Sequence, residues 1–190
     1  MLVLGKKALA IGISQRTSTE AIDLLAERLF ADEESGIERI LALDIPNVRA
    51  YMHLDTVFTQ LDADKFLVHP GILETLRIFL LEKDGTGPAH VSQMDKPLSQ
   101  VLAEVLGLPS VSLIRCGGGD RVTSEREQWN DGSNVLCVRP GTVIAYDRNR
   151  VTNELLREQG IEVLEIPSSE LSRGRGGPRC MSMPLLREEI

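Results

Sequence analysis

The chain has 190 residues, of which 42% are hydrophobic, 26% are charged and only 4% are aromatic. This composition is typical of a soluble globular protein whose core is built from aliphatic side chains. The formal net charge of −7 argues against a protein that binds nucleic acid or an anionic membrane, because both partners require a basic surface. No apolar run approaches the ~18 residues of a membrane span, and the first residues lack the features of a signal peptide.

The cysteine content indicates the redox environment. Cys116, Cys137 and Cys180 are an odd number and show no C-x-x-C spacing. The sequence therefore indicates neither a disulfide framework nor a zinc site. We expect a cytoplasmic protein with reduced thiols.

Short apolar runs alternate with helical patterns along the chain. The predicted elements, in chain order, are a hairpin of Leu2–Leu4 and Ala8–Ile13, a helix that begins near Ser18, a strand over Val48–Leu54, a hairpin of Val57–Leu61 and Lys65–His69, a helix over Leu98–Leu106, a strand over Val111–Ile114, a hairpin of Asn134–Val138 and Thr142–Tyr146, a helix over Asn149–Glu158 and a strand over Ile161–Ile166. Gly107 ends the helix that begins at Leu98. The segment Leu81–Lys96, rich in Gly, Asp, Lys and Pro, is predicted to be a surface connection.

The first and the last of these units form an internal repeat. When Leu2–Leu25 is laid against Leu136–Gln159 without a gap, hairpin matches hairpin and helix matches helix. A middle unit lies between them, and each unit reads strand-strand-helix-strand. Stacked repeats place equivalent loops at the same end of the assembly, so we expect the loop residues of the three units to converge. These residues are His53, Asp55, Asp120 and Cys180. A generic hairpin-and-helix pattern is the alternative interpretation.

Cys180 is the candidate nucleophile. It follows a loop rich in Gly and Pro, where a thiol can be exposed, whereas a lone cysteine in a protein is most often buried and inert. Arg173, Arg175 and Arg179 surround it in sequence, and nearby positive charge lowers the pKa of a thiol. The alternative for these arginines is an RGG-like tail that binds nucleic acid.

Further candidates lie earlier in the chain. Along the predicted strand, alternation sends the side chains of His53 and Asp55 to the same face, and a His beside a carboxylate suits acid–base chemistry. A strand-end His with an Asp cap is the alternative. Arg16, at a strand-to-helix turn, could bind a carboxylate or remain a solvated surface charge. Asp131 and Asn134 are interpreted as turn residues.

Four stretches of the sequence resemble motifs of the arginine deiminase family. They are Gly12-Ile-Ser-Gln-Arg-Thr-Ser18, Met52-His-Leu-Asp-Thr-Val-Phe-Thr59, Trp129-Asn-Asp-Gly-Ser-Asn134 and Gly174-Arg-Gly-Gly-Pro-Arg-Cys-Met-Ser-Met-Pro-Leu185. The resemblance runs essentially from end to end. It implies an α/β fold, the pentein-like α/β propeller of guanidine-modifying enzymes, here as an incomplete set of strand-strand-helix-strand units.

The resemblance also implies an activity, the hydrolysis of L-arginine to L-citrulline and ammonia without a metal or organic cofactor. Cys180 would attack the guanidinium carbon and form a thiouronium intermediate, His53 would act as acid and base, and Asp55 would hold the guanidinium group. Arg16 is similar to the family residue that binds the substrate carboxylate. Gly174 and Arg175 match the loop that lies against the substrate.

The chain resembles only the C-terminal half of the family. A Glu-Gly-Gly-Asp motif that precedes the first strand in the family, a further upstream Asp and a carboxylate-binding Arg have no counterpart. We therefore expect residues 1–190 to be the C-terminal part of a single catalytic domain, inactive alone, whose partner is a homo-oligomer subunit or a complementing N-terminal half. The alternatives are a related guanidino hydrolase or amidinotransferase, and a non-catalytic module.

Overall fold

The computed structural model describes residues 1–85 and 89–185, and these residues form three β-sheets. The strand orders are β1-β2-β3-β6-β7, β4-β5-β8 and β11-β10-β9. The strands are β1 (Leu2–Gly5), β2 (Ala8–Ile13), β3 (Arg39–Asp44), β4 (Phe58–Gln60), β5 (Lys65–Val68), β6 (Arg77–Glu82), β7 (His90–Gln93), β8 (Ser112–Arg115), β9 (Leu136–Arg139), β10 (Thr142–Tyr146) and β11 (Glu162–Ile166). The helices are α1 (Thr19–Ala31), α2 (Leu98–Leu106), α3 (Arg121–Trp129) and α4 (Arg150–Glu158), with short 3₁₀ turns at Arg49–Tyr51, Leu54–Thr56, Pro70–Ile72 and Leu171–Gly174.

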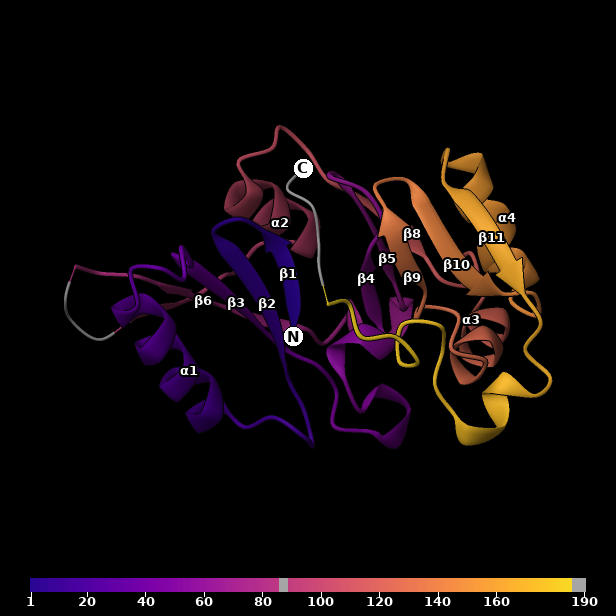
Figure 1. The fold of residues 1–190 in the computed structure, drawn as a ribbon, viewed down its shortest axis with the longest axis horizontal. Helices are drawn as coiled ribbons and strands as arrows, with labels where there is room; N and C mark the ends of the chain where they lie inside the picture. The colour runs from indigo at the N-terminus through magenta and orange to yellow at the C-terminus, as the bar shows by residue number, and fades with distance from the viewer. Residues whose placement is uncertain (86–88, 186–190) are drawn as a thin grey trace.

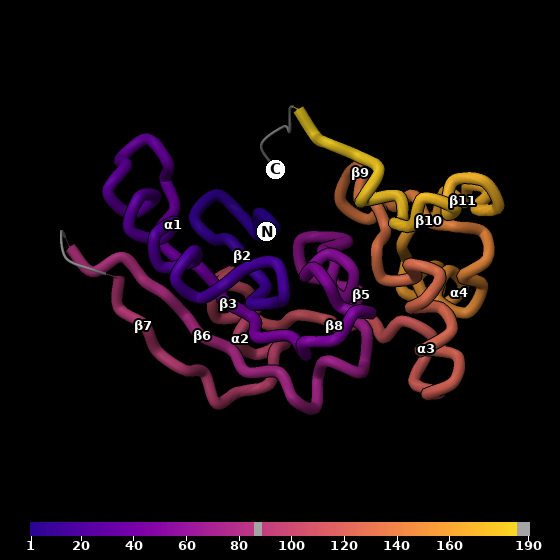
Figure 2. Tube along the Cα trace, turned by 90° about the horizontal axis from the view of Figure 1, so that it is seen from below, coloured from indigo at the N-terminus to yellow at the C-terminus, as the bar shows by residue number. Residues whose placement is uncertain are grey.

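The three sheets share one connection pattern. Each contains an antiparallel hairpin, a later helix and a strand that pairs in parallel with the second hairpin strand: β1-β2-α1-β3, β4-β5-α2-β8 and β9-β10-α4-β11. In the middle unit, β6 and β7 are inserted between β5 and α2 and pair with the first sheet. Figure 1 shows the three units beside one another, and Figure 2 shows that they follow an arc. The predicted repeat is therefore confirmed as a structural repeat. The described residues form an α/β fold in which no sheet closes on itself.

The middle sheet is buried on both faces. Consecutive strand residues point to opposite sides, and Phe66 and Leu67 accordingly enter two different cores. Phe66 stacks on Phe58 in the core that also contains α2 and one face of the first sheet, with ring centroids 5.2 Å apart. Leu67 packs in the core that contains the third sheet and Leu156 of α4. This double burial fixes the units relative to one another.

Local signals determine where the helices begin and end. Ser18 caps α1, because its hydroxyl accepts a hydrogen bond from the N–H of Ala21 at 3.3 Å. Gly107 ends α2 in the left-handed conformation, with φ of 67°, and its N–H donates to the carbonyls of Ala103 and Glu104. The predicted bounds of α2 are confirmed.

Two sequence predictions were wrong. Val48–Leu54, predicted as a strand, lies in and between two 3₁₀ turns, and the third strand of the first unit is β3, Arg39–Asp44. Leu81–Lys96, predicted as a surface connection, instead contains the end of β6 and all of β7, which pair antiparallel. Residues 86–88 of that segment lie outside the described residues.

Helix α3 has no counterpart among the predicted elements. Its residue Glu127 is 1% exposed and accepts hydrogen bonds from the backbone N–H groups of Val151 and Thr152 at 3.0 and 2.9 Å. A carboxylate at a helix N-terminus satisfies unpaired N–H groups and faces the positive end of the helix dipole. Glu127 thereby fastens α3 to the start of α4. No helix in the described part of the chain is both long and apolar enough to cross a membrane.

Candidate active site

A pocket of about 330 Å³ gathers most of the predicted site residues. Four segments line it: the two 3₁₀ turns between β3 and β4, the end of α3 with the turn that follows, Arg148 in the turn between β10 and α4, and the loop that leads to Cys180. His53, Gly174, Arg175 and Cys180 all face this space. The structure thus brings together a thiol and an imidazole that are far apart in the sequence.

The turn Trp129–Asn134 and Tyr146 hold the loop that carries Cys180. The backbone N–H of Cys180 donates to Asn134 Oδ1 at 3.0 Å, and the phenol of Tyr146 donates to the carbonyl of Gly176 at 2.8 Å. The backbone N–H of Gly176 lies close enough to the Asp131 carboxyl to lower its pKa, against the larger opposite effect of burial. These contacts fix a loop whose backbone is unusual, since Arg175 has a φ of 61° and Gly176 a φ of 105°.

Asp55 lies beside this assembly and does not line the pocket. Its carbonyl accepts a hydrogen bond from Asn134 Nδ2 at 2.6 Å, and its carboxylate is close enough to influence the pKa of the Cys180 thiol. The reason we gave for pairing it with His53 was wrong, because Leu54–Thr56 form a 3₁₀ turn in which side chains do not alternate. Asp55 nevertheless reaches the neighbourhood of Cys180. The α-amino group of Met1 also lies near Asp55, and burial lowers its pKa.

The electrostatic setting of Cys180 differs from the prediction. Burial raises the pKa of the Cys180 thiol above its ordinary value, and the negative charge of Asp55 raises it further. The three neighbouring arginines are not among the principal influences on this pKa. One of them, Arg175, places its guanidinium 5.2 Å from the centre of the Trp129 ring. Burial and the charge of Asp55 thus both favour the neutral thiol over the thiolate.

Two other predicted residues lie outside the pocket. Arg16 is exposed on the loop between β2 and α1, and its backbone N–H donates to Ser14 Oγ at 3.2 Å. Asp120 caps α3, because its carboxylate accepts a hydrogen bond from the N–H of Thr123 at 2.7 Å. The expectation that Asp120 converges with His53 and Cys180 was wrong.

The turn Trp129–Asn134 contains residues at the candidate site that sequence reasoning did not assign to it. Asp131 lines the pocket, burial raises the pKa of its carboxyl, and its φ is 59°. Asn134 is completely buried. The sequence by itself indicates only turn residues at both positions, although they lie in a stretch that resembles a family motif. That resemblance was the signal that could have identified them.

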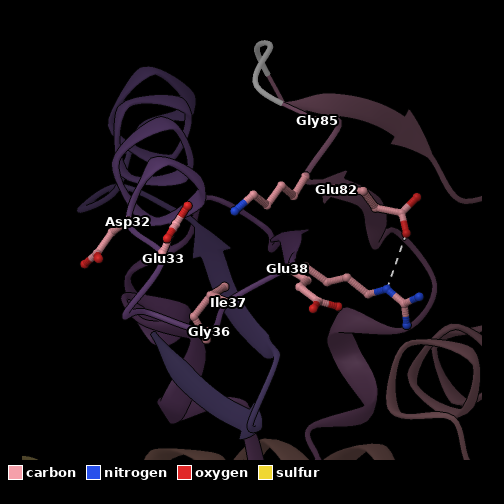
Figure 3. Close-up of a pocket in the computed structure, with 9 residues that line it drawn as sticks. Asp32, Glu33, Gly36, Ile37, Glu38, Glu82 and Gly85 are labelled. Atoms are coloured by element: carbon pink, nitrogen blue, oxygen red, sulfur yellow. Dashed lines mark ion pairs between the residues drawn. The ribbon is translucent and has the colours of Figure 1, made fainter.

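A larger pocket of about 530 Å³ lies between the end of α1 and the strands β3 and β6 (Figure 3). None of the predicted site residues lines it. Three of its charged side chains form ion pairs: Arg39 pairs with Glu82 at 3.3 Å, and Glu38 pairs with Lys7 at 2.7 Å. The smaller pocket is therefore the candidate active site. Within the described residues, no group of three or more His, Cys, Asp or Glu side chains is arranged to hold a metal ion.

Solved structures identify the class of fold. ArgZ, described as an arginine dihydrolase from the ornithine–ammonia cycle in cyanobacteria, is similar with a TM-score of 0.61 at 16% identity, over 100% of this chain and 24% of that chain. The N-terminal domain of ArgZ bound to its substrate matches with a TM-score of 0.59 at 17% identity, over 93% of this chain and 51% of that domain. At this level of identity the likeness defines the fold alone, that of the arginine dihydrolases.

Sequence comparison identifies the family. The family model for arginine deiminase matches residues 1–187, and the chain belongs to this family. It is 58% identical to the arginine deiminase of Treponema denticola over 100% of the chain and 47% of that protein, and 55% identical to that of Latilactobacillus sakei over 46% of that protein. The chain thus spans about half the length of the curated relatives that it matches.

Proposed function

We propose that this chain carries the nucleophile and the acid–base group of an arginine deiminase, which hydrolyses L-arginine to L-citrulline and ammonia. The observation that carries the proposal is the meeting of Cys180 and His53 in one pocket, with the carboxylate of Asp55 close enough to act on the thiol. A thiol, an imidazole and an anion are the groups that nucleophilic attack on a cationic guanidinium requires. Family membership supplies the reaction type.

In the proposed mechanism, the Cys180 thiolate adds to the guanidinium carbon of arginine. His53 gives a proton to the departing nitrogen, ammonia leaves, and a covalent thiouronium remains on Cys180. His53 then takes a proton from a water molecule that attacks the same carbon. The carbon–sulfur bond breaks, the thiolate is restored and citrulline departs with the oxygen of that water.

The raised pKa of Cys180 fits a site that is completed by its substrate. A guanidinium bound beside the thiol would offset the charge of Asp55 and favour the thiolate. Asp55 would accept hydrogen bonds from the guanidinium nitrogens. Gly174 and Arg175 would border the substrate where they line the pocket, and Arg16 would bind the substrate carboxylate from the loop between β2 and α1.

The complete site requires more than this chain. A guanidinium group presents hydrogen bonds in several directions, and one carboxylate at Asp55 cannot accept them all. The apolar side chains of Val3 on β1 and Val138 on β9 are 59% and 50% exposed on strands at the edges of their sheets. We infer that further strand-strand-helix-strand units extend the arc of Figure 2 to a closed α/β propeller in the whole protein, which would cover these edges. The amino group of Met1 lies near Asp55, which supports an arrangement in which other parts of such a protein contribute to the site.

The second candidate function is that of a non-catalytic module that complements a separate N-terminal half or a full-length subunit. The exposed edge strands favour it, since they provide a surface for association. We place the protein in the cytoplasm, because the proposed nucleophile Cys180 acts as a reduced thiol.

Complementation distinguishes the two functions. The 190-residue chain is assayed for citrulline formation from L-arginine, alone and mixed with the N-terminal half of the 58% identical Treponema denticola relative, and the mixture is sized by chromatography. We expect no turnover alone and turnover in a stable complex that the substitution Cys180→Ser abolishes and Cys137→Ser preserves. A complex without thiol-dependent turnover supports the non-catalytic module and overturns the enzyme proposal. Turnover by the chain alone overturns the inference that the site is incomplete.

A further inference from the structure

Asn134 makes hydrogen bonds to both segments that carry the proposed catalytic groups. Its side chain is 0% exposed. Nδ2 donates to the carbonyl of Asp55 at 2.6 Å, and Oδ1 accepts from the backbone N–H of Cys180 at 3.0 Å. The carbonyl of Asn134 also accepts from the N–H of Arg179 at 3.4 Å. One planar amide therefore spans the gap between the two segments.

The turn that carries Asn134 is itself anchored beside Asp55. Gln128 Nε2 donates to the carbonyl of Thr56 at 2.7 Å, and Thr59 Oγ1 donates to the carbonyl of Ser133 at 2.7 Å. Both bonds are buried and flank the contact between Asn134 and Asp55. The turn and the segment of Asp55 thus behave as one rigid support, against which the loop of Cys180 is positioned.

Gly177 shows how closely the Cys180 loop fits this support. A β-carbon at Gly177 would lie 2.7 Å from Asn134 Oδ1 and would also collide with the carbonyl of Asn134. Only a residue without a side chain lets the loop approach Asn134 this closely. The contact therefore depends on two residues: Asn134 on the support supplies the amide, and Gly177 on the loop leaves the space for it.

We propose that Asn134 is a positioning residue that sets the Cys180 thiol at a fixed distance from the Asp55 carboxylate. The planar amide holds its donor and its acceptor in a fixed geometry, so it can satisfy a carbonyl on one side and an N–H on the other. The inference rests on the proposed function, because the fixed distance matters where a cationic carbon must meet the thiol and the carboxylate together. The hydrogen bonds of Asn134 go to the backbones of Asp55 and Cys180, and its side chain also lies close enough to the Cys180 thiol to lower the pKa of that thiol.

The test compares two alkylating probes of similar size that label Cys180 by displacing chloride. 2-Chloroacetamidine is a cation and 2-chloroacetamide is neutral. Both react with the thiolate, so the ratio of their labelling rates does not depend on how much of Cys180 is ionised. Labelling of Cys180 is followed by peptide mass spectrometry, which separates it from Cys116 and Cys137. A carboxylate held beside the thiol attracts the cationic probe and therefore raises the rate with 2-chloroacetamidine relative to the rate with 2-chloroacetamide. We expect Asp55→Asn to lower this ratio roughly threefold to fivefold, which is the scale of a partly exposed charge contact.

The effect of Asp55→Asn is then measured again in two further backgrounds. In Asn134→Ala we expect Asp55→Asn to leave the ratio nearly unchanged, because the carboxylate is no longer held at a fixed distance from the thiol. Asn153→Ala is the matched control: Asn153 is equally buried, but its side chain donates to the Tyr146 carbonyl and to Glu165. In that background we expect the full effect to persist.

Each outcome has a definite meaning. If Asp55→Asn lowers the ratio equally in the original chain and in Asn134→Ala, the positioning role is overturned while the proposed function stands. If Asp55→Asn has no effect even in the original chain, the role of Asp55 in the proposed function fails, and the inference fails with it. If Asn134→Ala does not fold by circular dichroism, Gly177→Ala, which pushes the loop away, decides in the same way. Its control is Gly5→Ala, whose β-carbon would meet only Leu106, at 3.8 Å.

Discussion

The hydrogen bond from Tyr146 to the Cys180 loop leads to a quantitative prediction. The ring of Tyr146 is 1% exposed, and its hydroxyl donates to the carbonyl of Gly176 at 2.8 Å. Tyr146→Phe keeps the buried ring and removes only this donor. Because a net intramolecular hydrogen bond contributes about 1 kcal/mol, the free energy needed to open the loop should fall by that amount. This corresponds to an approximately fivefold increase in the population of the open loop.

Limited trypsin digestion measures this opening. The loop contains Arg173, Arg175 and Arg179, and cleavage of a folded chain requires the segment to open first. We expect the rate of cleavage in this loop to rise about fivefold in Tyr146→Phe. The matched control is Tyr51→Phe, which removes a hydrogen bond of similar length, 3.0 Å, to His69 and should leave the loop cleavage unchanged.

Two results would refute this reasoning. The first is an unchanged cleavage rate in the Tyr146 variant, which would show that the bond to Gly176 does not hold the loop. The second is an equal increase in both variants, which would show that cleavage follows global unfolding. Urea denaturation of both proteins separates these effects, because we expect each to lose about 1 kcal/mol of global stability.

The remaining predictions concern reactivity and stability. The rate of alkylation of Cys180 by iodoacetamide should rise with pH, and the midpoint of this rise should lie above that of an ordinary thiol. Asp55→Asn should lower the midpoint, which mass spectrometry at a series of pH values measures. An unchanged midpoint would contradict the electrostatic account. Gly117→Ala should lower the free energy of unfolding by at least about 2 kcal/mol, because its φ is 70° and a β-carbon would lie 2.5 Å from Ser124 Cα. Glu127→Gln should lower the free energy of unfolding, measured by urea denaturation, by roughly 1.5–3 kcal/mol, because a charged acceptor binds the N–H groups of α4 more strongly than a neutral amide. Equal stability of the two proteins would show that the carboxylate is not required at the start of α4.

The fold was largely predictable where its signals are local. The hairpins and helices follow from alternation, turn residues and caps such as Ser18 and Gly107, and the repeat follows from matching units. Strand β3 was missed because its residues Ile40–Leu43 form a continuous buried run, which lacks the alternation of a half-exposed strand. β6 and β7 were missed because the Gly- and Pro-containing segment between them suggested a connection throughout.

The site was predictable in its residue types and less so in its electrostatics. Cys180 and His53 do meet, as the repeat suggested, but Asp120 remains a helix cap. Charge counted along the sequence suggested that the arginines lower the pKa of Cys180. In the structure Arg175 lies over Trp129, and burial and Asp55 act in the opposite direction. Side-chain direction and desolvation are tertiary properties, which residue spacing does not encode.

The double burial of the middle sheet has a consequence for how this protein can change during evolution. Because neighbouring residues such as Phe66 and Leu67 belong to different cores, a one-residue insertion in β5 would exchange the side chains of both cores at once. Mutations there must preserve two packing arrangements simultaneously. We therefore expect β5 to vary slowly among homologues and to unfold together with both neighbouring units in a single cooperative transition, whereas insertions should be tolerated in the exposed turn at Asp62–Asp64.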